Sequence, residues 1–212
     1  MSEARHPLAA LIGGPRGALE GMAPPIVFVF AYALSGSELA WAIGAALVVG
    51  VILAIWRLMR SERPVRVVGA LFVVALGALV AAYTGNAVAY FWPLVLANVV
   101  SALAFAVSIL IRWPLLGVIV GPIVGTRMRW RADPDLLRAY SRASWLWVAL
   151  NLIRAAVQVP LIEGENLWAL AAVRPVFYLL VLATIWLSWI VIRKSLPAGH
   201  PGIRTVRSVQ DS

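Results

Sequence analysis

The stretch ASWLWVALNLIRAAVQVPLI, residues 143–162, is almost wholly apolar. About 20 such residues cross the hydrocarbon core of a bilayer as one helix, so this stretch predicts a membrane-spanning segment. Arg154 lies near its middle, where a guanidinium costs about 2.5–3.5 kcal/mol on insertion scales. An arginine kept at that depth usually faces protein, water or a bound anion. Arg154 is therefore the first candidate for a functional residue.

Five further segments, on either side of this stretch in the sequence, have the length and composition of a membrane span. They are 22–36, 39–56, 67–84, 87–111 and 168–192. The composition agrees, because the 212 residues are 62% hydrophobic and 13% charged, against about 25% charged in soluble domains. We therefore predict an all-α integral membrane bundle of six transmembrane helices in a single domain over 21–195. Residues 1–20 are expected to be a cytoplasmic or interfacial segment, and 196–212 a disordered cytoplasmic tail.

The loops between the predicted spans alternate in charge. SGSE (35–38), TGN (84–86) and EGEN (163–166) contain no Lys or Arg. RLMRSERPVR (57–66) contains four arginines and RMRWRADPDLLRAYSR (127–142) contains five. Because cytoplasmic loops carry the excess of Lys and Arg, this alternation predicts that both termini are cytoplasmic.

Several classes of site are excluded by composition. Cysteine is absent, which excludes disulfides and cysteine-ligated metals, and His6 and His200 lie in the terminal segments. We therefore expect no metal and no cofactor in the bundle. The net charge of +9 comes mainly from arginines flanking the spans, so nucleic-acid binding is not expected. No nucleophile–base pair or paired carboxylates are found, so we expect no enzymatic activity and no catalytic residue. Lys194 is the only lysine, and with the abundance of Ala, Val and Gly this indicates a GC-rich bacterium and hence its plasma membrane.

One apolar segment, PLLGVIVGPIVG (114–125), is too short to cross, at about 18 Å as a helix. Arg112 and Arg127 bracket it, so both flanks should lie on the same side. We predict a short re-entrant or interfacial helix, or one packed on the bundle. Its glycines recur at the four-residue spacing that permits close helix contact, which is compatible with a homodimer. They are Gly117, Gly121 and Gly125.

The run Asp133-Pro134-Asp135 predicts a helix start, with an acidic N-cap, a proline in the first turn and a second acid at the positive end of the helix dipole. We expect this helix to continue directly into the span at 143–162.

Polar residues of the fifth span fall on one face, within an arc of about 80°. They are Ser144, Trp147, Asn151, Arg154 and Gln158. This stripe should face the bundle interior or a cavity, because lipid cannot satisfy its polar groups. The predicted cavity residues are Arg154, Asn151, Gln158, Asn98 and Arg174.

Two interpretations of Arg154 stay open. It either ties spans together through backbone carbonyls freed by prolines, or it attracts an anion into a cavity, whether a solute, a phosphate or a lipid head group. Arg174 lies about one turn inside the outer end of the sixth span, and snorkelling to the interface is an equal alternative for it.

Landmarks along the chain also resemble a known family. They are the run Gly13-Gly14-Pro15-Arg16-Gly17, Glu20 before an apolar run from Pro24 to Tyr32, the pairs Trp92-Pro93, Pro114-Leu115 and Pro134-Asp135, and then Trp145 and Trp168. With these the chain resembles an uncharacterised domain-of-unknown-function family of multi-pass membrane proteins from high-GC bacteria. More distantly it is similar to the intracellular septation protein A family, from which it departs at Arg142, at Arg154 and in the apolar segment 114–125. The resemblance implies a non-enzymatic inner-membrane protein associated with division and envelope integrity.

Two functions follow as hypotheses. The first is envelope or division-site organisation through lipid and protein contacts, in which cytoplasmic arginines bind anionic lipid at about 1 kcal/mol each. These arginines are Arg129, Arg131, Arg138 and Arg142. The second is a small transporter or channel for an anionic or polar solute, with Arg154 in a polar cavity. It predicts that Arg154→Gln leaves folding intact but abolishes flux.

Overall fold

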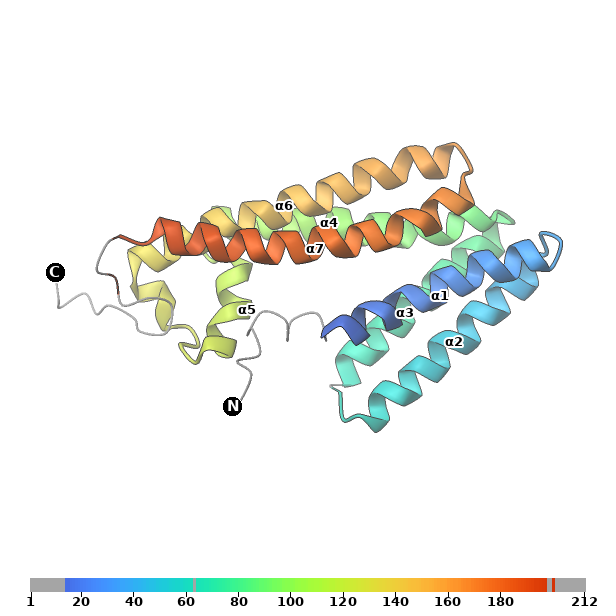
Figure 1. Cartoon of the computed structure of the whole chain (residues 1–212), viewed down its shortest axis with the longest axis horizontal. Helices are drawn as coiled ribbons and strands as arrows, with labels where there is room; N and C mark the ends of the chain where they lie inside the picture. The colour runs from blue at the N-terminus through green and yellow to red at the C-terminus, as the bar shows by residue number, and fades with distance from the viewer. Residues whose placement is uncertain (1–13, 63, 198–199, 201–212) are drawn as a thin grey trace. The chain divides into compact units, whose positions relative to one another are not determined.

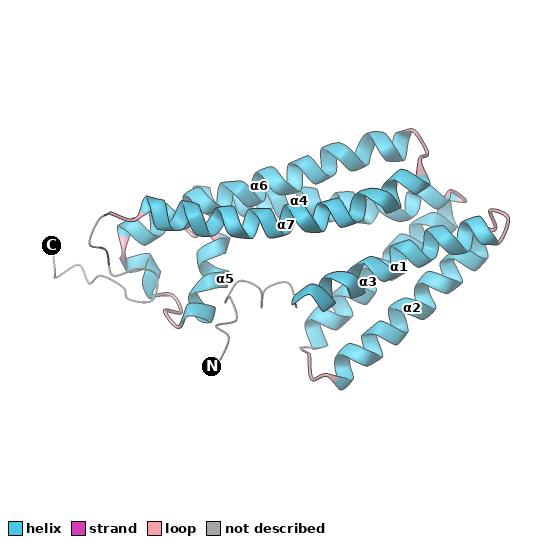
Figure 2. Ribbon diagram, viewed as in Figure 1, coloured by secondary structure: helices cyan, strands magenta, loops and turns pink. Residues whose placement is uncertain are grey.

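The computed structural model describes residues 14–62, 64–197 and 200, and within these ranges every regular element is a helix (Figure 2). The α-helices are α1 (Gly14–Leu34), α2 (Leu39–Met59), α3 (Pro64–Thr84), α4 (Trp92–Leu110), α5 (Leu115–Val124), α6 (Pro134–Glu163) and α7 (Leu167–Ser195) (Figure 1). Two short 3-10 helices, η2 (Ala87–Phe91) and η3 (Arg129–Ala132), precede α4 and α6. Helices are expected here, because a chain this apolar has to satisfy its backbone polar groups within each segment.

Five helical segments of the described part are long and apolar enough to cross a membrane. They are Leu39–Met59, Pro64–Thr84, Ala87–Leu110, Pro134–Glu163 and Leu167–Ser195. The all-α, membrane-type fold is thus confirmed, with five such segments rather than six. The remaining predicted span, 22–36, falls on α1, whose apolar part Glu20–Leu34 is shorter than the others.

Helix α1 begins earlier than predicted, at Gly14. Glu20, which we had assigned to the segment before the first span, therefore lies within the helix. Pro24 and Pro25 also lie inside α1 and do not end it. The carboxylate is accommodated in this helix because Arg57 of α2 pairs with it.

The chain divides into two compact units. Of the described residues, the N-terminal unit contains those within 14–97 and 155–178, and the C-terminal unit contains those within 98–154 and 179–200. Helices α4, α6 and α7 contribute residues to both units, so neither unit is one continuous length of chain. A single membrane domain over 21–195 stays a prediction.

In the N-terminal unit, α2 packs against both α1 and α3, and α3 packs against η2 (Figure 1). Gly77 permits the second contact, because a Cβ at this position would lie 2.7 Å from the carbonyl oxygen of Tyr90. The Tyr90 ring in turn stacks on Phe28 of α1, with ring centroids 4.2 Å apart. These contacts hold the start of α4 against α1 and α3.

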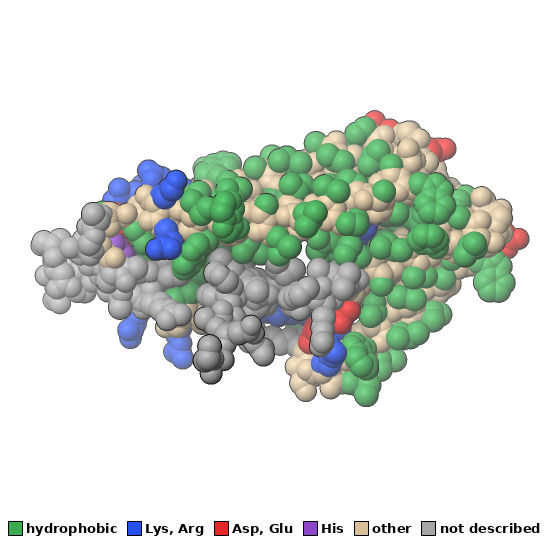
Figure 3. Space-filling model, in the orientation of Figure 1, with side chains coloured by type: hydrophobic (Ala, Val, Ile, Leu, Met, Phe, Trp, Pro, Cys, Tyr) green, Lys and Arg blue, Asp and Glu red, His purple; other side chains and the backbone are tan. Residues whose placement is uncertain are grey.

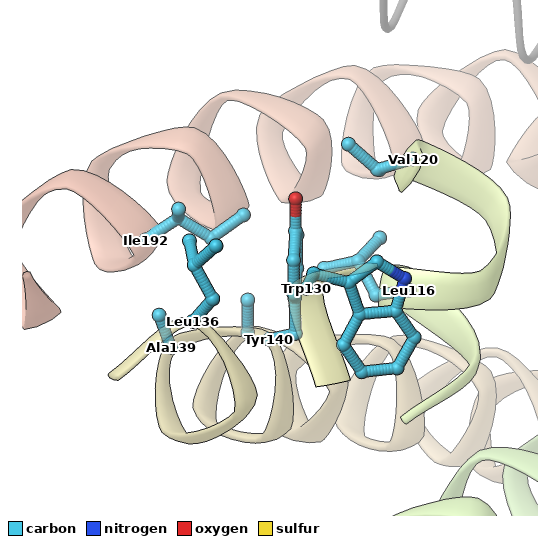
Figure 4. Close-up of a cluster of buried hydrophobic side chains, with 8 residues drawn as sticks. Leu116, Val120, Trp130, Leu136, Ala139, Tyr140 and Ile192 are labelled. Atoms are coloured by element: carbon cyan, nitrogen blue, oxygen red, sulfur yellow. The ribbon is translucent and has the colours of Figure 1, made fainter. Parts of the chain in front are cut away.

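In the C-terminal unit, α5 is a ten-residue helix packed into a hydrophobic cluster (Figure 4). The cluster consists of Leu116, Val120, Trp130, Leu136, Ala139, Tyr140, Ala143 and Ile192. A Cβ at Gly117 would lie 2.9 Å from the Trp130 ring, and one at Gly121 would lie 2.8 Å from its Nε1. The short helix is therefore confirmed, and its glycines make room for Trp130 of the same chain. A homodimer stays a prediction, but the four-residue spacing of the glycines no longer supports it, because these glycines contact Trp130 of the same chain.

Helix α6 starts and continues as predicted. Asp133 caps it, since its Oδ1 accepts hydrogen bonds from the backbone N–H groups of Asp135 (3.0 Å) and Leu136 (3.2 Å). The helix then runs for 30 residues without interruption. The other carboxylate oxygen contacts His200, which we had expected in a disordered tail. Of that tail, 198–199 and 201–212 lie outside the described residues.

Candidate functional site

The N-terminal unit contains a cavity of about 250 Å³ among α1, α2, α3, the η2–α4 segment and α7. Its walls are mainly apolar. The uncharged lining residues are Gly21, Pro24, Pro25, Gly50, Leu53, Ala54, Val67, Ala70, Leu71, Val73, Val74, Tyr90 and Leu94. Pockets that bind small ligands usually measure about 300–1,000 Å³, so this cavity suits a small molecule.

Small side chains leave this space open. Gly50 and Ala54 of α2 face the cavity one turn apart, and a Cβ at Gly50 would lie 3.3 Å from Cγ1 of Val74. Gly21 and Ala70 are exposed lining residues, whereas Tyr90 is buried. The cavity is therefore accessible on the side of Gly21 and Ala70 and closed at Tyr90.

An ion pair between α1 and α2 forms part of the cavity wall. The Nε of Arg57 donates to Oε2 of Glu20 at 2.8 Å, and Nη1 of Arg60 lies 3.8 Å from Oε1. The side chains of Glu20 and Arg57 are 15% and 16% exposed, so the pair is largely shielded. This wall can offer both a carboxylate and a guanidinium to a ligand.

A second guanidinium, that of Arg174, comes from the first half of α7. Its Cζ lies 5.5 Å from the centroid of the Phe91 ring, a cation–π arrangement, and it lies within electrostatic range of Tyr90. The aromatic pair at the end of η2 therefore positions Arg174 beside the cavity. This cavity is not the one that we predicted for Arg174 together with Arg154, and a ligand role for Arg174 stays a prediction alongside the snorkelling alternative.

The cavity lining carries charges of both signs. One carboxylate, from Glu20, stands against two guanidiniums, from Arg57 and Arg174, which gives a net formal charge of +1. In apolar surroundings the interactions of such charges are screened much less than in water.

The predicted stripe on α6 is buried, as expected from its spacing. Ser144, Asn151 and Gln158 are 0%, 7% and 4% exposed, and Arg154 is half-buried. The side-chain amide of Asn151 donates to the backbone carbonyl of Trp147 at 2.8 Å.

These residues are not among those that line the cavity described above. Arg154, Asn151 and Asn98 belong to the C-terminal unit, whereas Gln158 belongs, like Arg174, to the N-terminal unit. A ligand role for Arg154, Asn151, Gln158 and Asn98 stays a prediction.

The sequence analysis missed Glu20, Arg57 and Tyr90 as site residues. Glu20 and Arg57 are 37 residues apart in the chain. In the sequence, each looks like one of the charged residues that commonly flank a span. A usable signal was the spacing of Gly50, Ala54 and Arg57, which places two small residues and a cation on one face of α2.

Comparison with known families identifies the chain. A family model described as a protein of unknown function, DUF3159, matches residues 12–199. The chain belongs to the DUF3159 family. No curated protein and no solved structure matches it. The prediction of an uncharacterised family is confirmed, whereas the comparisons give no support to a similarity with septation protein A or to a high-GC source. The DUF3159 match includes all the cavity residues.

The DUF3159 region also includes an arginine patch, which we define as Arg129, Arg131, Arg138 and Arg142; all four are exposed. Lys and Arg side chains gather where α6 begins and α7 ends (Figure 3). The Arg131 Cζ lies 3.8 Å above the Trp113 ring, and Nη2 of Arg138 pairs with Oδ1 of Asp135 at 2.9 Å. Arg142 Nη1 reaches Oγ of Ser195 at 3.4 Å. The patch thus combines exposed cations with an exposed tryptophan, as interfacial surfaces do.

Proposed function

We propose that this DUF3159 protein is a small, non-enzymatic transporter for an organic anion, which binds in the cavity of the N-terminal unit. One observation carries the proposal: Arg57 and Arg174 both line a small cavity whose other walls are mainly apolar. The guanidiniums would bind the anionic group of the ligand. The apolar walls would hold the body of the same molecule.

We further propose a location in a bacterial plasma membrane, with α1 as the first of six spans and both termini cytoplasmic. The charges on α6 and α7 support this orientation. Arg138 and Arg142 lie near the start of α6 and Arg193 near the end of α7, whereas α6 ends at Glu163 and the loop that follows carries Glu165. In this orientation, Glu20 and Arg57 lie on the cytoplasmic side of the cavity.

Mass spectrometry of compounds that co-purify in mild detergent tests the anion site. Wild type is compared with Arg174→Gln, and Arg154→Gln serves as a matched control from the arginine outside this cavity. We expect an anionic compound in wild type and in Arg154→Gln but not in Arg174→Gln. Retention of the compound by Arg174→Gln contradicts the proposal. Loss of the compound from Arg154→Gln alone would indicate that the anion binds at α6 instead. Flux of the compound into proteoliposomes then tests transport.

A second candidate, envelope or division-site organisation through anionic lipid, is favoured by the arginine patch. Each patch arginine near an anionic surface contributes about 1 kcal/mol. Replacing all four by glutamine should therefore reduce the phosphatidylglycerol that co-purifies with the protein from a mixed lipid extract, and added salt should reduce it in wild type. An unchanged lipid content in the patch variant excludes this role for the patch.

A further inference from the structure

Glu20 already presents a carboxylate to a guanidinium of the proposed anion site. Its two oxygens meet two different arginines, Oε2 with Arg57 at 2.8 Å and Oε1 with Arg60 at 3.8 Å. Glu20 and Arg57 both line the cavity. An anion that enters the cavity therefore competes with Glu20 for Arg57.

We propose that Glu20 is a tethered competitor of the transported anion, and that this anion is a carboxylate attached to an apolar body. The inference rests on the proposed function, to which it adds the ligand class and the residue that controls occupancy. When the anion binds, Arg57 exchanges the Glu20 carboxylate for that of the ligand, and no covalent bond changes.

The arrangement of the arginines supports a carboxylate as the ligand group. A guanidinium presents parallel N–H donors that match the two oxygens of a carboxylate, and the Nε of Arg57 already donates to one such oxygen, that of Glu20, at 2.8 Å. The remaining wall from Gly50 to Ala54 and from Val67 to Val74 is apolar and fits a short hydrocarbon body. The volume of about 250 Å³ limits the ligand to a small molecule.

The same contacts explain why Glu20 can be displaced. Glu20 and Arg57 both line the cavity, and Arg60, 3.8 Å from the other Glu20 oxygen, remains as a partner for the displaced carboxylate. Arg174 also lines the cavity and places a second positive charge near the incoming anion. Once Glu20 leaves Arg57, the guanidinium of Arg57 can bind the ligand carboxylate.

Octanoate is a suitable probe because it joins a carboxylate to a short apolar chain. Binding of radiolabelled octanoate is measured by equilibrium dialysis of the protein in phosphatidylcholine nanodiscs, with binding to empty nanodiscs subtracted. Octan-1-ol and octylammonium, which have the same chain without the carboxylate, serve as competitors. Wild type is compared with Glu20→Gln, Glu20→Gln/Arg57→Gln and Arg174→Gln.

We expect Glu20→Gln to bind octanoate about fivefold more tightly than wild type, because the internal competitor is removed. The double variant should lose this gain, and Arg174→Gln should bind more weakly than wild type. Neither octan-1-ol, which is uncharged, nor octylammonium, which is cationic, should displace octanoate. If Glu20→Gln does not fold, Glu20→Asp, whose shorter side chain weakens the contact with Arg57, should show a smaller gain of the same sign.

The outcomes separate the two proposals. Unchanged or weaker binding in a folded Glu20→Gln variant, with weaker binding in Arg174→Gln, overturns the competitor role and leaves the anion site intact. Equal binding by wild type and Arg174→Gln overturns the proposed function itself. Displacement of octanoate by octan-1-ol at equal concentration overturns the carboxylate class.

Discussion

Asp133 and His200 are 67 residues apart in the chain, and their side chains meet where α6 begins: Oδ2 of Asp133 lies 2.9 Å from Nε2 of His200. Both side chains are only 1% exposed. The other oxygen of the same carboxylate caps α6 through the backbone amides of Asp135 and Leu136. One buried carboxylate therefore both starts α6 and holds the segment that follows α7.

Replacing Asp133 by alanine should destabilise the protein by about 2–4 kcal/mol. The loss of an N-cap costs about 1 kcal/mol, and the loss of a buried hydrogen-bond partner costs about 1–3 kcal/mol. Asp133→Asn should lose less, because asparagine is also a good cap. Asp135→Ala is the matched control, since its partner Arg138 is 68% exposed and such pairs contribute less than about 1 kcal/mol. Equal stability of Asp133→Ala and Asp135→Ala, measured by tryptophan fluorescence during thermal unfolding, would falsify the dual role.

Gly121→Ala should destabilise the C-terminal unit, by about 1–3 kcal/mol or more, as overpacking does. The added methyl group would collide with the Arg127 carbonyl oxygen and with the Trp130 ring. Gly44→Ala on α2 is the control, because nothing lies within 4 Å of its Cβ position and alanine favours the helix. Thermal unfolding of the two variants should therefore shift in opposite directions. Shifts of the same sign and size in the two unfolding midpoints would contradict the packing of α5 against Trp130.

Ala54→Leu should abolish octanoate binding while the protein stays folded, because the larger side chain extends into existing empty space. Ala40→Leu, on an exposed position of the same helix, should bind octanoate as wild type does. Equilibrium dialysis in nanodiscs measures both variants. Undiminished binding by Ala54→Leu shows that the ligand lies elsewhere.

The absence of cysteine makes the orientation of the chain directly measurable, because one introduced cysteine is the only thiol. Glu38→Cys and Glu62→Cys form a matched pair, since both positions are exposed acids in neighbouring loops. With cytoplasmic termini, a membrane-impermeant maleimide should label Glu38→Cys in intact cells and label Glu62→Cys only after permeabilisation. The reverse labelling pattern would show that the termini lie on the outer side of the membrane. Equal labelling of both variants in intact cells would rule out a crossing by α2.

Local signals predicted what depends on neighbours in the chain. The run from Asp133 to Asp135 marked the start of α6, and the helical spacing of Ser144, Asn151 and Gln158 predicted the face that is buried. Hydropathy alone found all five long apolar segments. These features follow from propensity and periodicity, which a single sequence contains.

The cavity was not predictable in the same way. Glu20 and Arg57 become a pair only because α1 and α2 pack together, and Arg174 joins them from more than a hundred residues later in the chain. The glycines of α5 illustrate the same limit. Their spacing correctly predicted a close contact, but only the tertiary structure shows that Trp130 is the partner.

Helix α6 has 30 residues and is therefore about 45 Å long, whereas the hydrocarbon core of a bilayer is about 30 Å thick. The helix is therefore longer than one crossing needs, and the charges of Arg138 and Arg142 favour its first turns as the part beyond the lipid tails. The side chains of Leu136 and Tyr140 that pack with α5 arise from the same turns. In such a placement the packing of this cluster would not depend on the thickness of the hydrocarbon layer.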